Sequence, residues 1–188
     1  MGKQTNKRGS NFGGEWTQIK LTIIDDYLRF YVSALKNLNV KLIYIDAFAG
    51  SGKTILPNGI EIKGSALISL QYDFDEYYFL EIDLSRKKEL ESIIQKDFPE
   101  KISKVHIIND NCNNRLGEIL SNLTPYQRGV MFLDPYALEL DWSILLEASK
   151  TEILDIWYLF PLSALNRNLP KDKAKIKVNK IVANYYQV

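Results

Sequence analysis

The sequence predicts an α/β fold in which a mostly parallel sheet carries helices on both faces. Two patterns support this prediction. Short, nearly continuous apolar segments alternate with longer segments whose apolar residues recur every three or four positions. Continuous apolar strands are typical of parallel sheets, because such strands are buried on both faces. The 188 residues are enough for one domain of ordinary size, and the crossovers between strands are expected to be right-handed.

The expected elements alternate along the chain. Strands are expected at residues 41–45, 77–80, 105–108, 130–133 and 153–160. Helices are expected at about residues 17–39, 65–72, 90–98, 116–123 and 141–149. Ser65 can cap the second of these helices. The glycine-rich segment 47–64, with Pro57 and Asn58-Gly59, is expected to form a loop with a small hairpin.

The composition excludes several classes of protein. Cys112 is the only cysteine, which excludes an internal disulfide and a cysteine-cluster zinc site. His106 is the only histidine, so we expect no metal site and no Ser-His-Asp triad. No apolar run reaches the roughly 18–20 residues that span a bilayer, and the polar N-terminus lacks the apolar region of a signal peptide. We therefore expect a cytoplasmic protein with no membrane partner.

The charge is unevenly distributed along the chain. The net charge is +1, but residues 1–14 carry +3, residues 166–188 carry +5, and the stretch between them carries −7. We expect a disordered basic tail at 1–14, a folded domain at 15–165 and a basic segment at 166–188. The two basic ends are where a nucleic-acid backbone is expected to bind. Only 28 residues follow Phe160, so we expect a short sheet or one whose C-terminal strands are missing.

An acidic residue stands at the end of each of the first four expected strands. These residues are Asp46, Glu81, Asp110 and Asp134. In open parallel sheets, ligands bind beyond the carboxyl ends of the strands, at the point where the strand order reverses. Four acids at four successive strand ends therefore predict a binding site at that edge.

The loop after the first strand has three interpretations. Lys53 and Thr54 fit a relaxed Walker A spacing for a nucleoside triphosphate, but Pro57 and Asn58-Gly59 disfavour the helix that should start there. A dinucleotide-binding loop would need glycine or alanine where Ile55 stands. The third ligand is S-adenosylmethionine, which methyltransferase sheets bind with an acid, an aromatic residue and a Gly-x-Gly turn. This interpretation explains more of the strand-end acids than the other two.

The S-adenosylmethionine interpretation gives each residue a role. Asp46, Phe48, Gly50 and Gly52 form the loop that contacts the cofactor. Glu81 follows the second strand and can accept hydrogen bonds from both ribose hydroxyls, because a carboxylate offers only acceptors.

Two further strand ends complete this interpretation. Asp110 can accept from the adenine amino group, although the asparagines around it also suit an ordinary turn. Asp134-Pro135-Tyr136 follows the fourth strand and can meet the substrate. The expected reaction is methyl transfer to an exocyclic amine of a nucleic-acid base. Asp134 and the Pro135 carbonyl would accept the amine hydrogens, and Tyr136 would stack on the base.

The chain resembles the three-Cys-motif partner protein family over roughly residues 15–170. The resemblance rests on ordered short motifs: Trp16 with Lys20, Tyr44-Ile45-Asp46-Ala47-Phe48-Ala49-Gly50-Ser51-Gly52, Gly64-Ser65, Phe79-Leu80-Glu81-Ile82-Asp83, Phe132-Leu133-Asp134-Pro135-Tyr136, Phe160-Pro161 and Asn166-Arg167. The chain departs from the family pattern at Ser51, where members tend to have proline, and at Ala137, where they tend to have glycine.

The resemblance implies a Rossmann-like class I methyltransferase fold and a protein partner encoded nearby. It implies catalytic activity less firmly than fold, so a catalytically weak or inactive partner protein is an alternative function, and a P-loop-type nucleotide-binding protein is a further one. Lys20 and Trp16 can either line the mouth of the cofactor site or pack as a pair where the first helix begins.

Overall fold

The computed structural model describes residues 10–168. Most of the expected N-terminal tail, residues 1–9, lies outside the described part, as do residues 169–188 of the expected basic C-terminal segment. None of the helices in residues 10–168 is long and apolar enough to cross a membrane.

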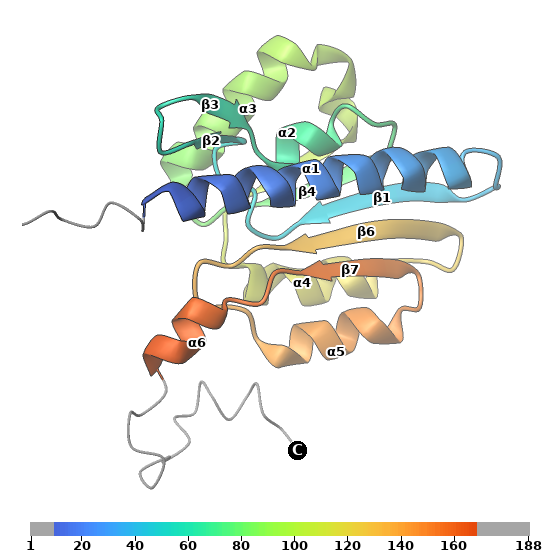
Figure 1. Cartoon of the computed structure of the whole chain (residues 1–188). Helices are drawn as coiled ribbons and strands as arrows, with labels where there is room; N and C mark the ends of the chain where they lie inside the picture. Colours follow the sequence, from blue (N-terminus) through green and yellow to red (C-terminus); the bar gives the residue numbers. More distant parts are fainter. Residues whose placement is uncertain (1–9, 169–188) are drawn as a thin grey trace, which may run out of the picture.

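A parallel sheet of five strands forms the centre of the molecule (Figure 1). Its order is β5-β4-β1-β6-β7, and every neighbouring pair is parallel. The strands are β1 (Lys41–Asp46), β4 (Glu76–Leu80), β5 (Val105–Ile108), β6 (Gln127–Leu133) and β7 (Leu154–Tyr158). The predicted fold class, a Rossmann-like α/β fold with a mostly parallel sheet between helices, is confirmed.

Helices cover both faces of the sheet, and each layer has its own apolar core. The first layer contains α1 (Ser10–Leu35), α2 (Ser65–Ser69) and α3 (Leu84–Asp97). The second contains α4 (Cys112–Ser121) and α5 (Trp142–Lys150). A 3-10 helix, η2 (Pro99–Lys104), precedes β5, and α6 (Leu162–Asn168) follows β7.

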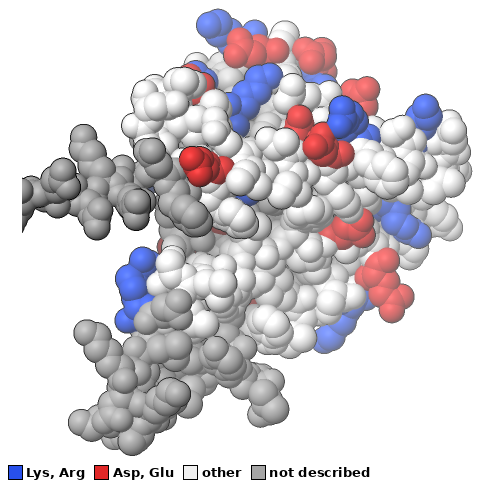
Figure 2. Space-filling view, in the orientation of Figure 1, with Lys and Arg blue, Asp and Glu red and all other residues white. Residues whose placement is uncertain are grey.

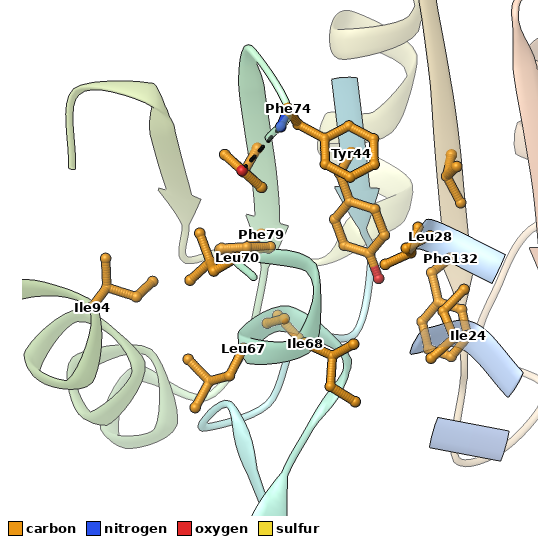
Figure 3. Packing of buried hydrophobic residues seen from close by; sticks show 14 of the residues in the cluster. Ile24, Leu28, Tyr44, Leu67, Ile68, Leu70, Phe74, Phe79, Ile94 and Phe132 are labelled. Atoms are coloured by element: carbon orange, nitrogen blue, oxygen red, sulfur yellow. Dashed lines mark hydrogen bonds between the residues drawn. The ribbon is translucent and has the colours of Figure 1, made fainter. Parts of the chain in front are cut away.

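The central strand β1 supplies side chains to both cores in alternation. Leu42 and Tyr44 pack on the α1 side, whereas Ile43 and Ile45 pack on the α4 side. Tyr44 lies among aromatic rings in Figure 3, with its ring centroid 5.6 Å from that of Phe74. The four β1 side chains and Phe74 are all buried. Strand β1 therefore lies in the hydrophobic interior, between the two cores.

The first helix begins earlier than the sequence predicts. The apolar repeat predicts a start near Thr17, and residues 10–14 were expected in the tail, yet α1 begins at Ser10. Gly14 is buried against Pro57, whose Cγ would lie 2.8 Å from a Cβ at that position. This contact with a distant loop requires a glycine and outweighs the poor helix propensity of the residue.

The segment after β1 forms the expected small hairpin. Strands β2 (Lys53–Ile55) and β3 (Glu61–Lys63) pair antiparallel, with Lys53 opposite Lys63. The hairpin replaces the helix that a phosphate-binding loop would need at this point. Gly64 then caps α2, so Ser65 is the first helical residue and is not the cap that the sequence predicted.

Gly129 in β6 provides a test of the sheet packing. A Cβ there would lie 2.7 Å from the carbonyl oxygen of Ile43 and 3.0 Å from Leu154 Cδ2, and the backbone cannot yield as a flexible side chain can. We predict that Gly129→Ala lowers the free energy of unfolding by about 1–3 kcal/mol, measured by chemical denaturation.

The matched control is Gly117→Ala in α4. A Cβ at Gly117 meets only Glu147 Oε2, at 3.3 Å, which is the end of a flexible side chain. Because alanine is a better helix former than glycine, this control should raise the free energy of unfolding by roughly 0.5–1 kcal/mol. Equal effects of the two substitutions would contradict the packing described here.

Candidate functional site

The strand order reverses between β1 and β6, so the crevice in which such sheets bind ligands is expected at the carboxyl ends of these two strands. From β1 the chain continues to β4 and β5 on one side, whereas β6 leads to β7 on the other. The loops that follow β1 and β6 therefore separate, which is the arrangement that forms ligand sites in such sheets. Asp46 ends β1, and Asp134 directly follows β6.

Three of the strand-end acids point to the α1 side of the sheet. Residues at alternate positions of a strand share a face. Tyr44, Phe79 and Phe132 all pack in the core beneath α1, and the acid two residues after each of them is Asp46, Glu81 or Asp134. The structure thus brings Asp46 and Asp134 close enough for their charges to interact, and it places Glu81 at the same edge of the sheet.

Asp46 is completely buried and organises the loop around it. Its Oδ1 accepts a hydrogen bond from the Phe48 backbone N–H at 3.1 Å, and its Oδ2 accepts from the Ser65 hydroxyl at 2.5 Å. Burial raises the pKa of Asp46 to about 7, and the negative charge of Asp134 adds to this rise. The hydrogen bonds from Ser65 and Phe48 and the positive charge of Lys20 act in the opposite direction and lower the pKa of Asp46. Asp46 therefore holds the loop to α2 by contacts that leave no exposed carboxylate oxygen.

The glycine loop lies across the ends of three strands. Its backbone joins β6 through Ala47 N–H to the Phe132 carbonyl at 3.2 Å, and β4 through Ala49 N–H to the Leu80 carbonyl at 3.0 Å. Phe48, between these two anchors, is half-buried against the core on the α4 side. The loop is therefore fixed at both of its edges.

Two glycines of this loop have left-handed backbone conformations, with φ of +62° at Gly50 and +79° at Gly52. A Cβ at Gly52 would clash with Leu90 and Leu67, at 2.7 and 2.9 Å, so this glycine allows α2 and α3 to pack against the loop. A Cβ at Gly50 would meet nothing within 4 Å. Gly50 is thus the point where a ligand can approach the backbone closely.

Glu81 follows β4 and is 6% exposed. Its Oε1 accepts from the Asp83 backbone N–H at 2.7 Å, while no hydrogen bond to Oε2 is formed within the described part of the chain. Asn109 donates to the Glu81 backbone carbonyl at 2.8 Å and so ties the end of β4 to the loop after β5. Glu81 offers one fixed carboxylate oxygen beside the glycine loop.

Asp110 follows β5, which lies one strand farther from β1 than the strand that precedes Glu81. Its side chain is hydrogen-bonded to neighbouring residues in its own loop and in α4. Its Oδ1 accepts from the Asn111 backbone N–H at 2.7 Å and from Asn114 Nδ2 at 3.0 Å, and these bonds hold its pKa below the usual value. These hydrogen bonds agree with the turn interpretation of the segment, and a contact of Asp110 with adenine stays a prediction.

The Asp134-Pro135-Tyr136 segment follows β6 and carries a contact that the sequence did not predict. Lys20 of α1 forms an ion pair and a hydrogen bond with Asp134 Oδ2, with the two side chains 20% and 30% exposed. Pro135 is buried, whereas Tyr136 is 81% exposed. Asp134 is thus held by α1, and Tyr136 projects outward beside it.

Sequence reasoning missed two residues that shape the site. Ser65 binds the buried Asp46, and a serine next to a helix start reads first as a cap. Asn113 of α4 donates to the Glu139 carbonyl at 2.8 Å and accepts from Asp141 N–H at 3.0 Å, which fixes the loop after Tyr136. No sequence signal links Asn113 to a loop 26 residues away.

The structure places Lys53 away from a phosphate-binding position. It lies in β2 and forms an ion pair with Glu61 Oε1 at 2.6 Å across the hairpin. Two hollows are found elsewhere on the described surface: one of about 510 Å³ includes Lys41 and His106, and one of about 460 Å³ lies between α1 and β3. Neither is lined by a strand-end acid.

Comparison with known proteins finds structural neighbours. No protein-family model matches the chain, and no curated protein matches it. A protein from Legionella pneumophila superposes with a TM-score of 0.49 at 16% identity, over 77% of this chain and 64% of that chain. A candidate methyltransferase from Escherichia coli gives a TM-score of 0.37 at 18% identity, over 70% and 61%. A candidate methylase from Haemophilus influenzae gives 0.40 at 19% identity, over 71% and 65%.

The chain spans less than two thirds of the length of these three proteins. The fold assignment rests on the strand order and the parallel pairing of the sheet itself.

The buried carboxyl of Asp46 predicts a pH-dependent stability. The Asp46 carboxyl group binds a proton more tightly in the folded protein than in the unfolded chain, because folding raises its pKa from 3.8 to about 7. The contribution of Asp46 to stability is therefore lost as the pH rises from about 4 to about 7. Asp46→Asn should gain stability relative to the wild type over this range, by at most about 4 kcal/mol, measured by urea denaturation at several pH values.

Asp83→Asn is the matched control. Asp83 caps α3, and its hydrogen bonds from Arg86 and Ser85 lower its pKa. Its substitution should lose stability relative to the wild type as the pH rises, which is the opposite trend. A pH-independent effect of Asp46→Asn would contradict the buried, proton-binding state described above.

Proposed function

We propose that this protein is an S-adenosylmethionine-dependent methyltransferase that acts on an exocyclic amine of a nucleic-acid base. The observation that carries the proposal is the position of Glu81 beside the glycine loop, since the residue before it accepts the Ala49 N–H at 3.0 Å. A fixed carboxylate next to a loop that a ligand can approach suits a nucleoside with free ribose hydroxyls.

The residues present fit S-adenosylmethionine better than a nucleotide phosphate. Glu81 Oε2 would accept from the ribose hydroxyls, and the open face of Gly50 would lie against the ligand. The Gly52-Lys53-Thr54 segment leads into strand β2, so the helix that a phosphate-binding loop needs directly after its lysine is not formed there. When bound, the cofactor supplies an activated methyl group. Asp46 would act indirectly, by holding the loop in place.

The proposed acceptor site lies at Asp134-Pro135-Tyr136. The amine of a nucleobase is a weak nucleophile because its lone pair is delocalised into the ring. Asp134 and the Pro135 carbonyl would accept its hydrogens, which would orient the nitrogen and raise its electron density. Tyr136 is 81% exposed and would provide a stacking surface for a base presented outside a helix.

Contacts to a nucleic-acid backbone belong in this proposal to the two basic ends. In the view of Figure 2, lysines and arginines alternate with acids over the described surface, and no continuous basic patch is visible there. The excess positive charge lies at residues 1–14 and 166–188, most of which are outside the described residues. Phosphate binding by these segments would make affinity strongly dependent on salt.

A second candidate function is a catalytically weak or inactive partner protein. This alternative agrees with the resemblance to the three-Cys-motif partner family. It is favoured by the ion pair between Lys20 and Asp134, because an acceptor amine would first have to displace the Lys20 ammonium. The two functions differ in whether the protein transfers a methyl group to nucleic acid.

Calorimetry tests the cofactor. We expect wild-type protein to bind S-adenosylmethionine, and Glu81→Gln to bind it at least about tenfold more weakly, because one charge-assisted hydrogen bond is worth about 1.5–3 kcal/mol. Glu76→Gln, at the opposite end of the same strand, is the control and should bind normally. Binding of Mg²⁺-ATP without binding of S-adenosylmethionine would overturn the proposal.

A transfer assay tests the reaction. RNA, DNA and protein pools are incubated with labelled cofactor and either wild-type protein or Asp134→Asn. We expect wild-type protein to label nucleic acid. The rate of labelling by Asp134→Asn should be at least about 100-fold lower, as is typical when a group that stabilises the transition state is removed. The affinity of the variant for the cofactor should be unchanged. Equal labelling by both proteins would remove Asp134 from the reaction, and no labelling by either would support the inactive alternative.

A further inference from the structure

Lys20 belongs to the buried stripe of α1 although its side chain is charged. Ile24 and Leu28 follow it at intervals of four residues, which places the three on one helix face, and both are completely buried against the sheet. Figure 1 shows that α1 runs opposite to the strands, with its N-terminal half over the strand ends. The stripe therefore passes from apolar core to the strand-end acids between Ile24 and Lys20.

The contact that Lys20 makes is the one expected of an acceptor amine. Its Nζ donates to Asp134 Oδ2, the carboxylate proposed to receive the acceptor hydrogens. Both side chains are partly shielded from water, so this charge-assisted bond is stronger than one on an open surface. A nitrogen donor thus already occupies the acceptor side of the crevice.

We propose, on the basis of the proposed function, that the Lys20 ammonium occupies the subsite of the acceptor nitrogen. Lys20 is then a positioning residue that keeps Asp134 directed into the crevice until an N–H group of the acceptor replaces it. This assignment places Lys20 on the acceptor side of the crevice, whereas the sequence left it between the cofactor mouth and a packing role. It also identifies the acceptor class as a nitrogen that carries a hydrogen.

The charges around Lys20 allow this exchange. Lys20 comes from α1, Asp46 from β1 and Asp134 from the loop after β6, and these are the charged groups that act on one another at this edge. The charge of Lys20 lowers the pKa of Asp46, which shows that the two groups interact electrostatically. The hydrogen bonds to the Asp46 carboxyl come from Phe48 and Ser65. The Lys20 side chain is 20% exposed, so an ammonium displaced from Asp134 would still have access to water and would not be left buried without a partner.

Binding of a probe amine to the full chain tests the proposal. The probe is adenosine, titrated with and without saturating S-adenosylmethionine so that binding in the cofactor site is recognised. Purine riboside, which lacks the exocyclic amine, is its matched control. In wild-type protein the amine must break the bond between Lys20 and Asp134. In Lys20→Met this bond is absent, so adenosine should bind about tenfold more tightly than to wild type, which corresponds to about 1.4 kcal/mol. The affinity for purine riboside should change by less than about twofold. Lys20→Arg should restore the wild-type affinity.

Two control measurements separate this effect from a loss of structure. Arg29→Met, which removes an exposed ion pair with Asp26 on the same helix, should leave adenosine binding unchanged. The affinity of Lys20→Met for S-adenosylmethionine should stay within about twofold of wild type, because Lys20 is assigned to the acceptor side. A thermal melt of each variant confirms that it is folded.

The outcomes distinguish this inference from the proposed function. The inference is wrong if Lys20→Met binds adenosine no better than wild type does. It is also wrong if Lys20→Met loses cofactor affinity about tenfold while purine riboside and adenosine bind equally well. If the adenosine gain appears but wild-type protein does not bind S-adenosylmethionine, the proposed function fails and the assignment of Lys20 to an amine subsite stands.

Discussion

The hydrogen-bonded burial of Asp46 is the constraint on which the rest of the site depends. Its carboxyl group ends the central strand, binds the Ser65 hydroxyl of α2 and accepts the Phe48 N–H of the glycine loop. Burial of a carboxyl group is unfavourable unless it is hydrogen-bonded or neutralised. Here both occur, because two donors are present and the pKa is raised to about 7. One side chain thereby joins β1, the glycine loop and α2.

The same edge of the sheet contains a small electrostatic network. Beyond the effect of burial, the charge of Asp134 raises the pKa of Asp46, and the charge of Lys20 lowers it. The ammonium is supplied by α1, whose apolar stripe packs on the sheet along Ile24 and Leu28. Packing of one helix therefore determines both the core beneath it and the charge balance at the strand ends.

The sequence predicted the order and type of the main elements because their patterns are local. Alternation of apolar strands with three- and four-residue repeats identified the five strands of the sheet, and the strand 105–108 was located to the residue. The start of α1 and the cap of α2 were wrong. Gly14 is helical because it packs against Pro57, and Ser65 binds Asp46, and neither long-range partner can be seen in the local pattern. Helix α6 was not predicted at all.

The sequence by itself determined which chemical groups stand at the strand ends, because a strand, a turn and an acid are adjacent in the chain. Only the tertiary structure decided what each group does. It buried Asp46, left Glu81 Oε2 without a hydrogen bond in the described part of the chain, and gave Asp110 hydrogen bonds from Asn111 and Asn114. It also brought Lys20 to Asp134 across 114 residues. The reason is physical: the direction and burial of a side chain follow from the packing of elements that are distant in sequence, and this packing is not encoded in any single segment.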